Sequence, residues 1–114
     1  MPAGGAHSNP VVRLSVSVSK RLIVQGRLPL GTEREDAISF HVAVLDGRGP
    51  RVLPHLQRYI ARRRATLHML DEVGPVMHIR IELTEGSARG TPVAFLNCGC
   101  RLALALERVI AEHE

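Results

Sequence analysis

Apolar side chains occupy every second position in four stretches of this chain, and this two-residue period constrains the fold more than any other feature. Because successive side chains of a β-strand point to opposite faces of a sheet, each stretch has one apolar face and one polar face. The pattern predicts a mainly antiparallel sheet that is covered on one face only. The apolar positions are Leu14, Val16 and Val18; Leu22, Val24, Leu28 and Leu30; Ile38, Phe40, Val42 and Val44; and Met77, Ile79, Ile81 and Leu83.

Two further segments have the spacing of amphipathic helices. Pro54 suits the first turn of a helix and Gly74 with Pro75 suits its end, so we predict a helix over about 54–73. Its apolar stripe is Leu53, Leu56, Ile60, Leu67 and Leu70. A closing helix is predicted from Asn97 onward, because Leu102, Ala103, Leu106, Val109 and Ile110 recur at helical spacing.

The elements give the order β-β-β-α-β-β-α. The predicted strands cover 11–19, 22–30, 37–45, 76–84 and 93–96, with turns at 31–36 and 85–92. We therefore predict a two-layer α+β sandwich, in which about five mainly antiparallel strands carry two helices on one face. Residues 1–10 are expected to be a flexible leader and residues 11–114 a single domain, a size that can bury a core without disulfides or metals.

The composition favours a protein of the cytoplasm. Cys98 and Cys100 stand too close in sequence for an unstrained disulfide, which indicates free thiols and a reducing compartment. No signal peptide and no run of about 18 apolar residues is present, so we expect no membrane partner. The net charge of +4 rests almost wholly on arginine, with Lys20 the only lysine. Genome composition explains this bias more simply than function does, although positive charge also favours acidic partners.

A basic ridge is predicted on the outer side of the first helix. At 100° per residue, His55, Arg58 and Arg62 fall within about 60° of one another, away from the apolar stripe. With Arg64, these side chains suit contact with phosphates, because guanidinium groups match phosphate oxygens. An ordinary solvated helix face is the simpler interpretation.

The same helical geometry places Arg63 among the apolar positions, between Ile60 and Leu67. An unpaired charge is costly there, so we expect its stem to reach past the helix edge or its guanidinium to meet a carboxylate. A subunit contact or ligand cleft at this point is the third alternative. The candidate carboxylates are Glu82, Asp71 and Glu107.

The open face of the sheet is the second candidate surface. It is predicted to carry Ser15, Ser17, Ser19, His41, His78, Arg80 and Glu82, with Ala43 and Leu45 among them. Such a face can serve as a recognition platform or as a dimer interface, and an ordinary wet face is an equally good interpretation. His41 and His78 are neighbours if their strands are, but two histidines alone make a weak metal site. We predict no metal site and no cofactor.

The third candidate is Asn97-Cys98-Gly99-Cys100, placed at the start of the closing helix. With Asn97 as N-cap, the helix terminus would lower the pKa of a nearby thiol, and His41 or His78 could then act as its base. The alternative is that these cysteines are small structural residues. A zinc site made from both cysteines and two histidines has no fixed geometry in its favour.

No phosphate-binding loop, nucleophile elbow, zinc-protease motif or aromatic RNA-binding signature is present. We therefore predict a small non-enzymatic interaction module that binds a protein partner through the open sheet face or the basic helix, as a homodimer. The alternatives are a nucleic-acid-binding protein that uses the arginine-rich helix, and a thiol-dependent enzyme or redox protein that uses Cys98 or Cys100.

Overall fold

The computed structural model describes residues 10–30, 38–83 and 91–113. Residues 1–9 of the predicted leader, the predicted turn at 31–36 and residues 85–90 of the predicted turn at 85–92 lie outside these ranges. Five strands and two helices follow in the order β-β-β-α-β-β-α. They are β1 (Val11–Val16), β2 (Leu22–Pro29), β3 (Ile38–Val44), α1 (Gly49–Ala61), β4 (Ala65–Val73), β5 (Val76–Leu83) and α2 (Pro92–Glu112).

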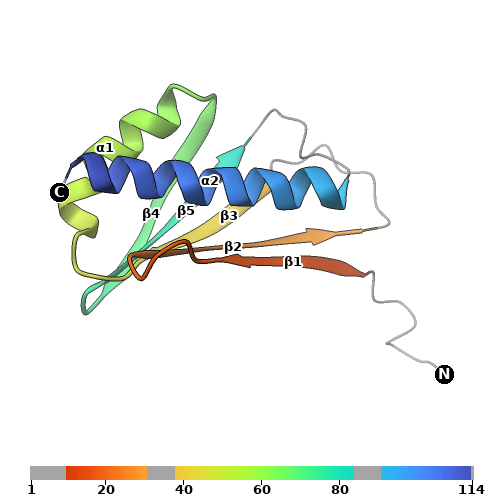
Figure 1. Ribbon diagram of the computed structural model, residues 1–114, viewed down its shortest axis with the longest axis horizontal. Helices are drawn as coiled ribbons and strands as arrows, with labels where there is room; N and C mark the ends of the chain where they lie inside the picture. The colour runs from red at the N-terminus through yellow and green to blue at the C-terminus, as the bar shows by residue number, and fades with distance from the viewer. Residues whose placement is uncertain (1–9, 31–37, 84–90, 114) are drawn as a thin grey trace.

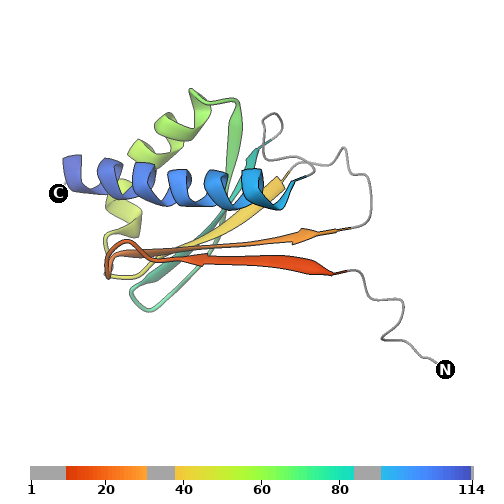
Figure 2. The ribbon, with the colours of Figure 1, turned by 45° about the vertical axis from the view of Figure 1, so that its right-hand side comes forward.

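The strands form one antiparallel sheet in the order β1-β2-β3-β5-β4. β4 and β5 make a hairpin, and β5 lies between β4 and β3. β3 and β4 therefore run in the same direction, and α1 provides the crossover between them. Both helices lie on the same side of the sheet (Figure 1, Figure 2), with α2 on β1 and β2, α1 on β4 and β5, and the two helices in contact. The predicted α+β sandwich is confirmed.

The core lies between the helices and one face of the sheet, as the alternating pattern requires. Phe40 and Ile79 are fully buried on the helix side, whereas their neighbours His41 and Arg80 lie on the opposite face. The ring of Phe40 stacks on that of Phe95 from α2, with centroids 5.2 Å apart. All buried side chains among the described residues are apolar. No described helix has the length and hydropathy needed to cross a membrane.

The first helix is shorter than predicted, because residues 65–73 form β4 and not a second half of α1. The chain turns at Arg64, which takes a left-handed conformation with φ of 53°. Gly74, with φ of 58°, then turns β4 into β5 and does not end a helix. Leu67 and Leu70 are consequently strand residues, and the predicted helical stripe ends at Ile60.

The closing helix is longer than predicted. Val93 belongs to the first turn of α2 and Asn97 to its interior, so the strand predicted over 93–96 is wrong and Asn97 is not a cap. The helix begins after Thr91, whose hydroxyl accepts a hydrogen bond from the backbone N–H of Ala94 at 3.2 Å. Pro92 follows at the first helical position, where its missing N–H leaves no bond unmade. The predicted number of strands is right because β4 replaces the strand assigned to 93–96.

Candidate functional site

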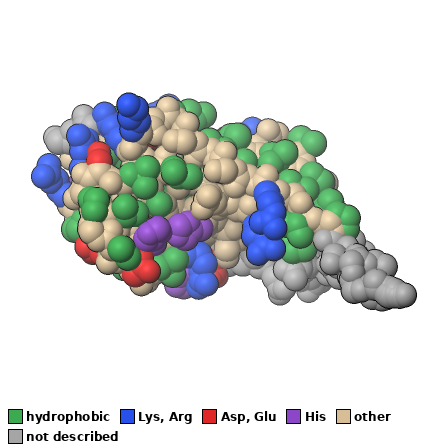
Figure 3. All heavy atoms as spheres, turned by 90° about the horizontal axis from the view of Figure 1, so that it is seen from below, with side chains coloured by type: hydrophobic (Ala, Val, Ile, Leu, Met, Phe, Trp, Pro, Cys, Tyr) green, Lys and Arg blue, Asp and Glu red, His purple; other side chains and the backbone are tan. Residues whose placement is uncertain are grey.

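The open face of the sheet carries rows of side chains that cross several strands. One row crosses all five strands and is polar throughout; it consists of Ser15, Gln25, His41, Arg80 and His68. The next row consists of Ile23, Ala43, His78 and Asp71. Figure 3 views the molecule from this side and shows histidines close together among apolar and charged side chains.

His41 and His78 meet on this face, which confirms that their strands are neighbours. Nδ1 of His78 lies 3.0 Å from Nε2 of His41, and the ring centroids are 5.0 Å apart. At this distance one nitrogen donates and the other accepts, so only one of the two carries a proton. Oδ1 of Asp71 lies 3.9 Å from Nε2 of His78 and favours a proton on that nitrogen. Nδ1 of His78 then accepts from Nε2–H of His41.

Burial lowers the pKa of His41 below its ordinary value, and the adjacent His78 lowers it further, while Asp71 acts in the opposite direction. A proton on Nδ1 of His78 would place two donors against each other and break this hydrogen bond. The ring nitrogens outside this contact, Nδ1 of His41 and Nε2 of His78, can form hydrogen bonds with a bound group.

A second polar cluster lies beside the pair. Oε1 of Glu82 lies 3.1 Å from a guanidinium nitrogen of Arg80 and 3.2 Å from Nε2 of His68. The His68 contact is not aligned as a hydrogen bond, so it is electrostatic only. Sequence reasoning missed His68 and Asp71 as site residues because it placed both in a helix. The signal that identifies them is the alternation of Ala65, Leu67 and Met69 with polar neighbours.

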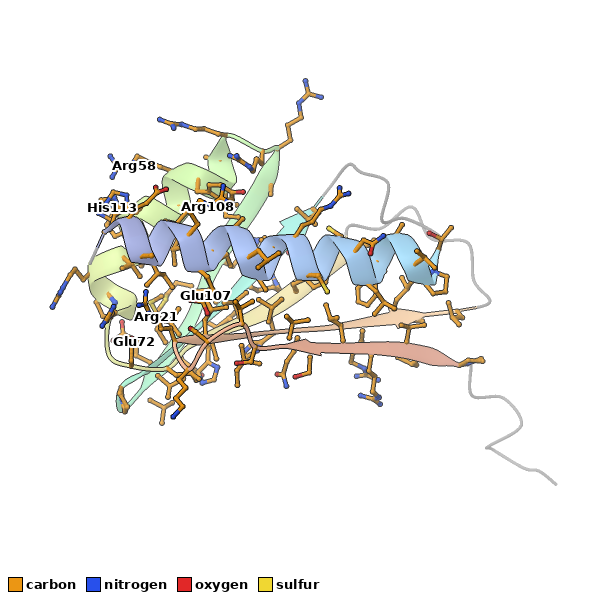
Figure 4. All side chains as sticks on the ribbon, viewed as in Figure 1. Arg21, Arg58, Glu72, Glu107, Arg108 and His113 are labelled. Atoms are coloured by element: carbon orange, nitrogen blue, oxygen red, sulfur yellow. The ribbon has the colours of Figure 1, made fainter. Side chains whose placement is uncertain are left out.

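Two residues predicted for this face lie elsewhere. β1 ends at Val16, so Ser17 and Ser19 belong to the connection to β2. The hydroxyl of Ser17 donates to the carbonyl of Ser19 at 2.7 Å, and the hydroxyl of Ser19 bonds to Glu107 of α2. Val18, expected on the apolar face, is 48% exposed for the same reason. Figure 4 shows Glu107 directed from α2 towards the sheet.

The predicted basic ridge forms a cluster where α1 meets the end of α2. A guanidinium nitrogen of Arg58 lies 2.6 Å from Nδ1 of His55, and the His55 ring stacks on that of His113 at 3.5 Å. Arg58, Arg108 and His113 gather at this end of the molecule (Figure 4). The pKa of His55 is lowered, first by desolvation and then by the neighbouring charges of His113 and Arg58. Arg62, which caps the end of α1, is exposed nearby.

Arg63 does not lie in the apolar stripe, because α1 has ended before it. Its guanidinium covers the Tyr59 ring at 3.7 Å and contacts the Tyr59 carbonyl at 3.5 Å. The guanidinium thus lies over an aromatic face and meets none of the predicted carboxylates, while a subunit contact at this point stays a prediction. The predicted partners have other contacts: Glu82 with Arg80, Asp71 with His78, and Glu107 with Ser19. Arg64 forms the turn into β4.

The two cysteines lie within α2 and not at its N-terminus. Both are free. Cys98 is half-buried, and burial raises the pKa of its thiol against the smaller opposing effect of Arg101. The predicted activation of a thiol by the helix terminus is therefore wrong, since the helix begins two turns earlier.

The described residues contain no group of three or more His, Cys, Asp or Glu side chains arranged to hold a metal ion. The polar residues of the open face and the arginines around α1 thus remain as the two candidate sites. No protein-family model, curated protein or solved structure matches the chain, and its function must be argued from these residues.

Proposed function

We propose that this protein is a non-enzymatic interaction module that binds a protein partner through the open face of its sheet, and that it acts as a homodimer. The observation that carries the proposal is the placement of both helices on one side. Within the described ranges, no helix or strand covers the other side of the five strands. An antiparallel sheet with one bare face is a rigid surface, and rigidity lowers the entropy that binding must overcome.

The size of the open face suits a protein partner. Five strands about 4.8 Å apart, with about seven residues each rising 3.3 Å, span a flat area of roughly 500 Å². The accessible area of a surface covered by side chains exceeds its flat projection, which brings the face close to the roughly 800 Å² that one partner buries in a standard interface.

The chemistry of the face supports binding and not catalysis. Arg80 and Glu82 neutralise each other, and His41 and His78 are joined by a hydrogen bond. Gln25 and Ser39 add exposed donors and acceptors on neighbouring strands. We expect a partner surface rich in hydrogen-bonding groups, because each buried polar atom of the face must find a partner.

The proposal is tested by comparing two double variants in cell extract. Gln25→Arg with Ser39→Arg adds bulk and charge to the open face at exposed positions. Gln57→Arg with Leu104→Arg makes the same charge change on the exposed sides of α1 and α2. We expect the immobilised wild type and the Gln57→Arg, Leu104→Arg variant to retain the same protein from the extract, with crosslinks to β2 and β3. The Gln25→Arg, Ser39→Arg variant should not retain this protein. Equal retention by all three proteins would contradict the proposal.

Nucleic-acid binding is the second candidate, favoured by the exposed Arg58 and Arg62 beside Arg63. Binding to generic RNA or DNA would weaken steeply with salt, because phosphate contacts release counterions. Arg58→Glu with Arg62→Glu should then abolish the shift of a labelled oligonucleotide. An absence of wild-type binding at low salt would remove this candidate. The half-buried thiol of Cys98, whose pKa is raised by burial, speaks against the thiol-dependent alternative for that cysteine.

A further inference from the structure

The outer edge of β4 combines three properties of an association surface. We propose that a second copy of this chain pairs along this edge, with the two β4 strands antiparallel about a two-fold axis. The inference rests on the homodimer of the proposed function and names the strand that forms it.

β4 is the last strand of the sheet and pairs only with β5 among the described strands. The other edge of its backbone therefore offers N–H and C=O groups to an added strand. Of the six large apolar side chains exposed in the described ranges, three belong to this one strand. They are Met69 at 40%, Leu70 at 47% and Val73 at 64% exposed.

The charges around β4 select a second copy as the occupant. Arg62 and Arg63 precede the strand, Asp71 and Glu72 lie towards its end, and residues 65–70 carry no formal charge with histidine neutral. Antiparallel pairing of two β4 strands brings the arginine end of each strand to the carboxylate end of the other. This complementarity occurs twice in the dimer. Parallel pairing would instead place like charges together.

The other edge of the sheet lacks these properties. β1 carries Arg13 at its middle, and antiparallel pairing of two β1 strands would bring the two Arg13 side chains close together. A charge in the middle of an edge strand is a common protection against pairing. In β4 the irregularity between Met69 and Asp71 comes late in the strand, and residues 65–69 remain regular.

The proposed pairing has a consequence for the open face. Antiparallel strands in one continuous sheet are related by an axis perpendicular to that sheet, so the open faces of both copies lie on the same side. The clusters around His68 and Asp71 would then flank the axis, and the dimer would present one platform of twice the size.

Light scattering coupled to size-exclusion chromatography tests the edge with a matched pair of variants. Leu70→Lys places a lysine on the edge, and Leu104→Lys makes the same change at an exposed leucine of α2. We expect wild type and Leu104→Lys to be dimers, and Leu70→Lys to dissociate about tenfold more readily or more. A Leu70→Lys dimer as stable as wild type would overturn the edge inference but leave the homodimer intact. A wild-type monomer would overturn both, while binding through the open face is tested separately above.

Charge reversal tests the orientation independently. Arg62→Glu with Arg63→Glu gives a chain that is acidic at both ends of β4, and Asp71→Arg with Glu72→Arg gives one that is basic at both ends. Each chain alone should be a monomer, and an equimolar mixture should form a heterodimer. Circular dichroism establishes that both chains are folded. Folded chains that do not associate on mixing would overturn the antiparallel arrangement.

Discussion

Replacing Gly26 with alanine should destabilise the protein, although alanine is ordinarily preferred to glycine within a strand. Gly26 lies in β2, opposite Phe40 of β3. A Cβ atom at this position would stand 2.8 Å from Cδ1 of Phe40 and 2.8 Å from Cζ of Phe95. Both rings are fully buried and stacked on each other, so neither can swing into solvent to make room.

Two opposing contributions set the size of the effect. Alanine gains about 0.5–1 kcal/mol over glycine, because it has less backbone freedom to lose on folding. Overpacking a well-filled core costs roughly 1–3 kcal/mol. We expect a net loss of about 1–2 kcal/mol in the free energy of unfolding, a substantial part of the roughly 5–15 kcal/mol typical of a domain.

Urea unfolding followed by circular dichroism measures this loss. Gln25→Ala changes the adjacent exposed residue of the same strand and should stay within about 0.5 kcal/mol of wild type. Phe95→Leu removes one of the two ring atoms nearest to the added Cβ, so Gly26→Ala should cost less in that background, with a coupling above about 0.5 kcal/mol. A Gly26→Ala protein as stable as wild type would refute the packing of the two rings over the glycine.

Three further predictions follow from single contacts. Because the pKa of His41 is lowered on folding, the unfolded chain binds this proton more readily, so stability should fall as the pH drops below about 6.5. The fall should be smaller in His41→Gln, and an identical pH dependence of urea unfolding would contradict the His41–His78 contact. Iodoacetamide should label the exposed Cys100 faster than Cys98, as peptide mass spectrometry would show; equal rates would argue against the raised pKa of Cys98. Thr91→Ala should lower the free energy of unfolding by about 1 kcal/mol, and an unchanged urea midpoint would mean that the cap contributes nothing.

The fold class could be predicted because the two-residue period survives in the strands that form the middle of the sheet. In β3 and β5 the alternating residues Phe40, Val42, Ile79 and Ile81 are buried on the helix side, so the pattern and the packing have the same cause. The contact of His41 with His78 follows once β5 is placed beside β3. That neighbour relation is a matter of topology, and a sequence pattern specifies only which face each side chain occupies.

The wrong assignments fall where local pattern and backbone conformation are ambiguous. Residues 93–96 are a short apolar run, which fits a buried strand as well as a helix. Thr91 and Pro92 are a cap and a first-turn residue that identify the true start of α2. At the end of α1 no comparable signal exists, because Arg64 takes a left-handed conformation that arginine rarely adopts and that glycine normally marks.

The misassigned segment 65–73 is also the segment that the proposed dimer uses, and the two facts have one origin. Leu70 breaks the alternation of β4, and together with Leu67 it produced the helical spacing that led to the error. In the structure Leu70 lies at the irregularity of the strand and is 47% exposed, so the core of its own chain does not account for an apolar residue there. An apolar side chain outside the alternating pattern, on an edge that no other described strand pairs, gains burial when a strand of another chain is added there. The pairing of two β4 strands would supply that burial, and the Leu70→Lys comparison measures whether it does.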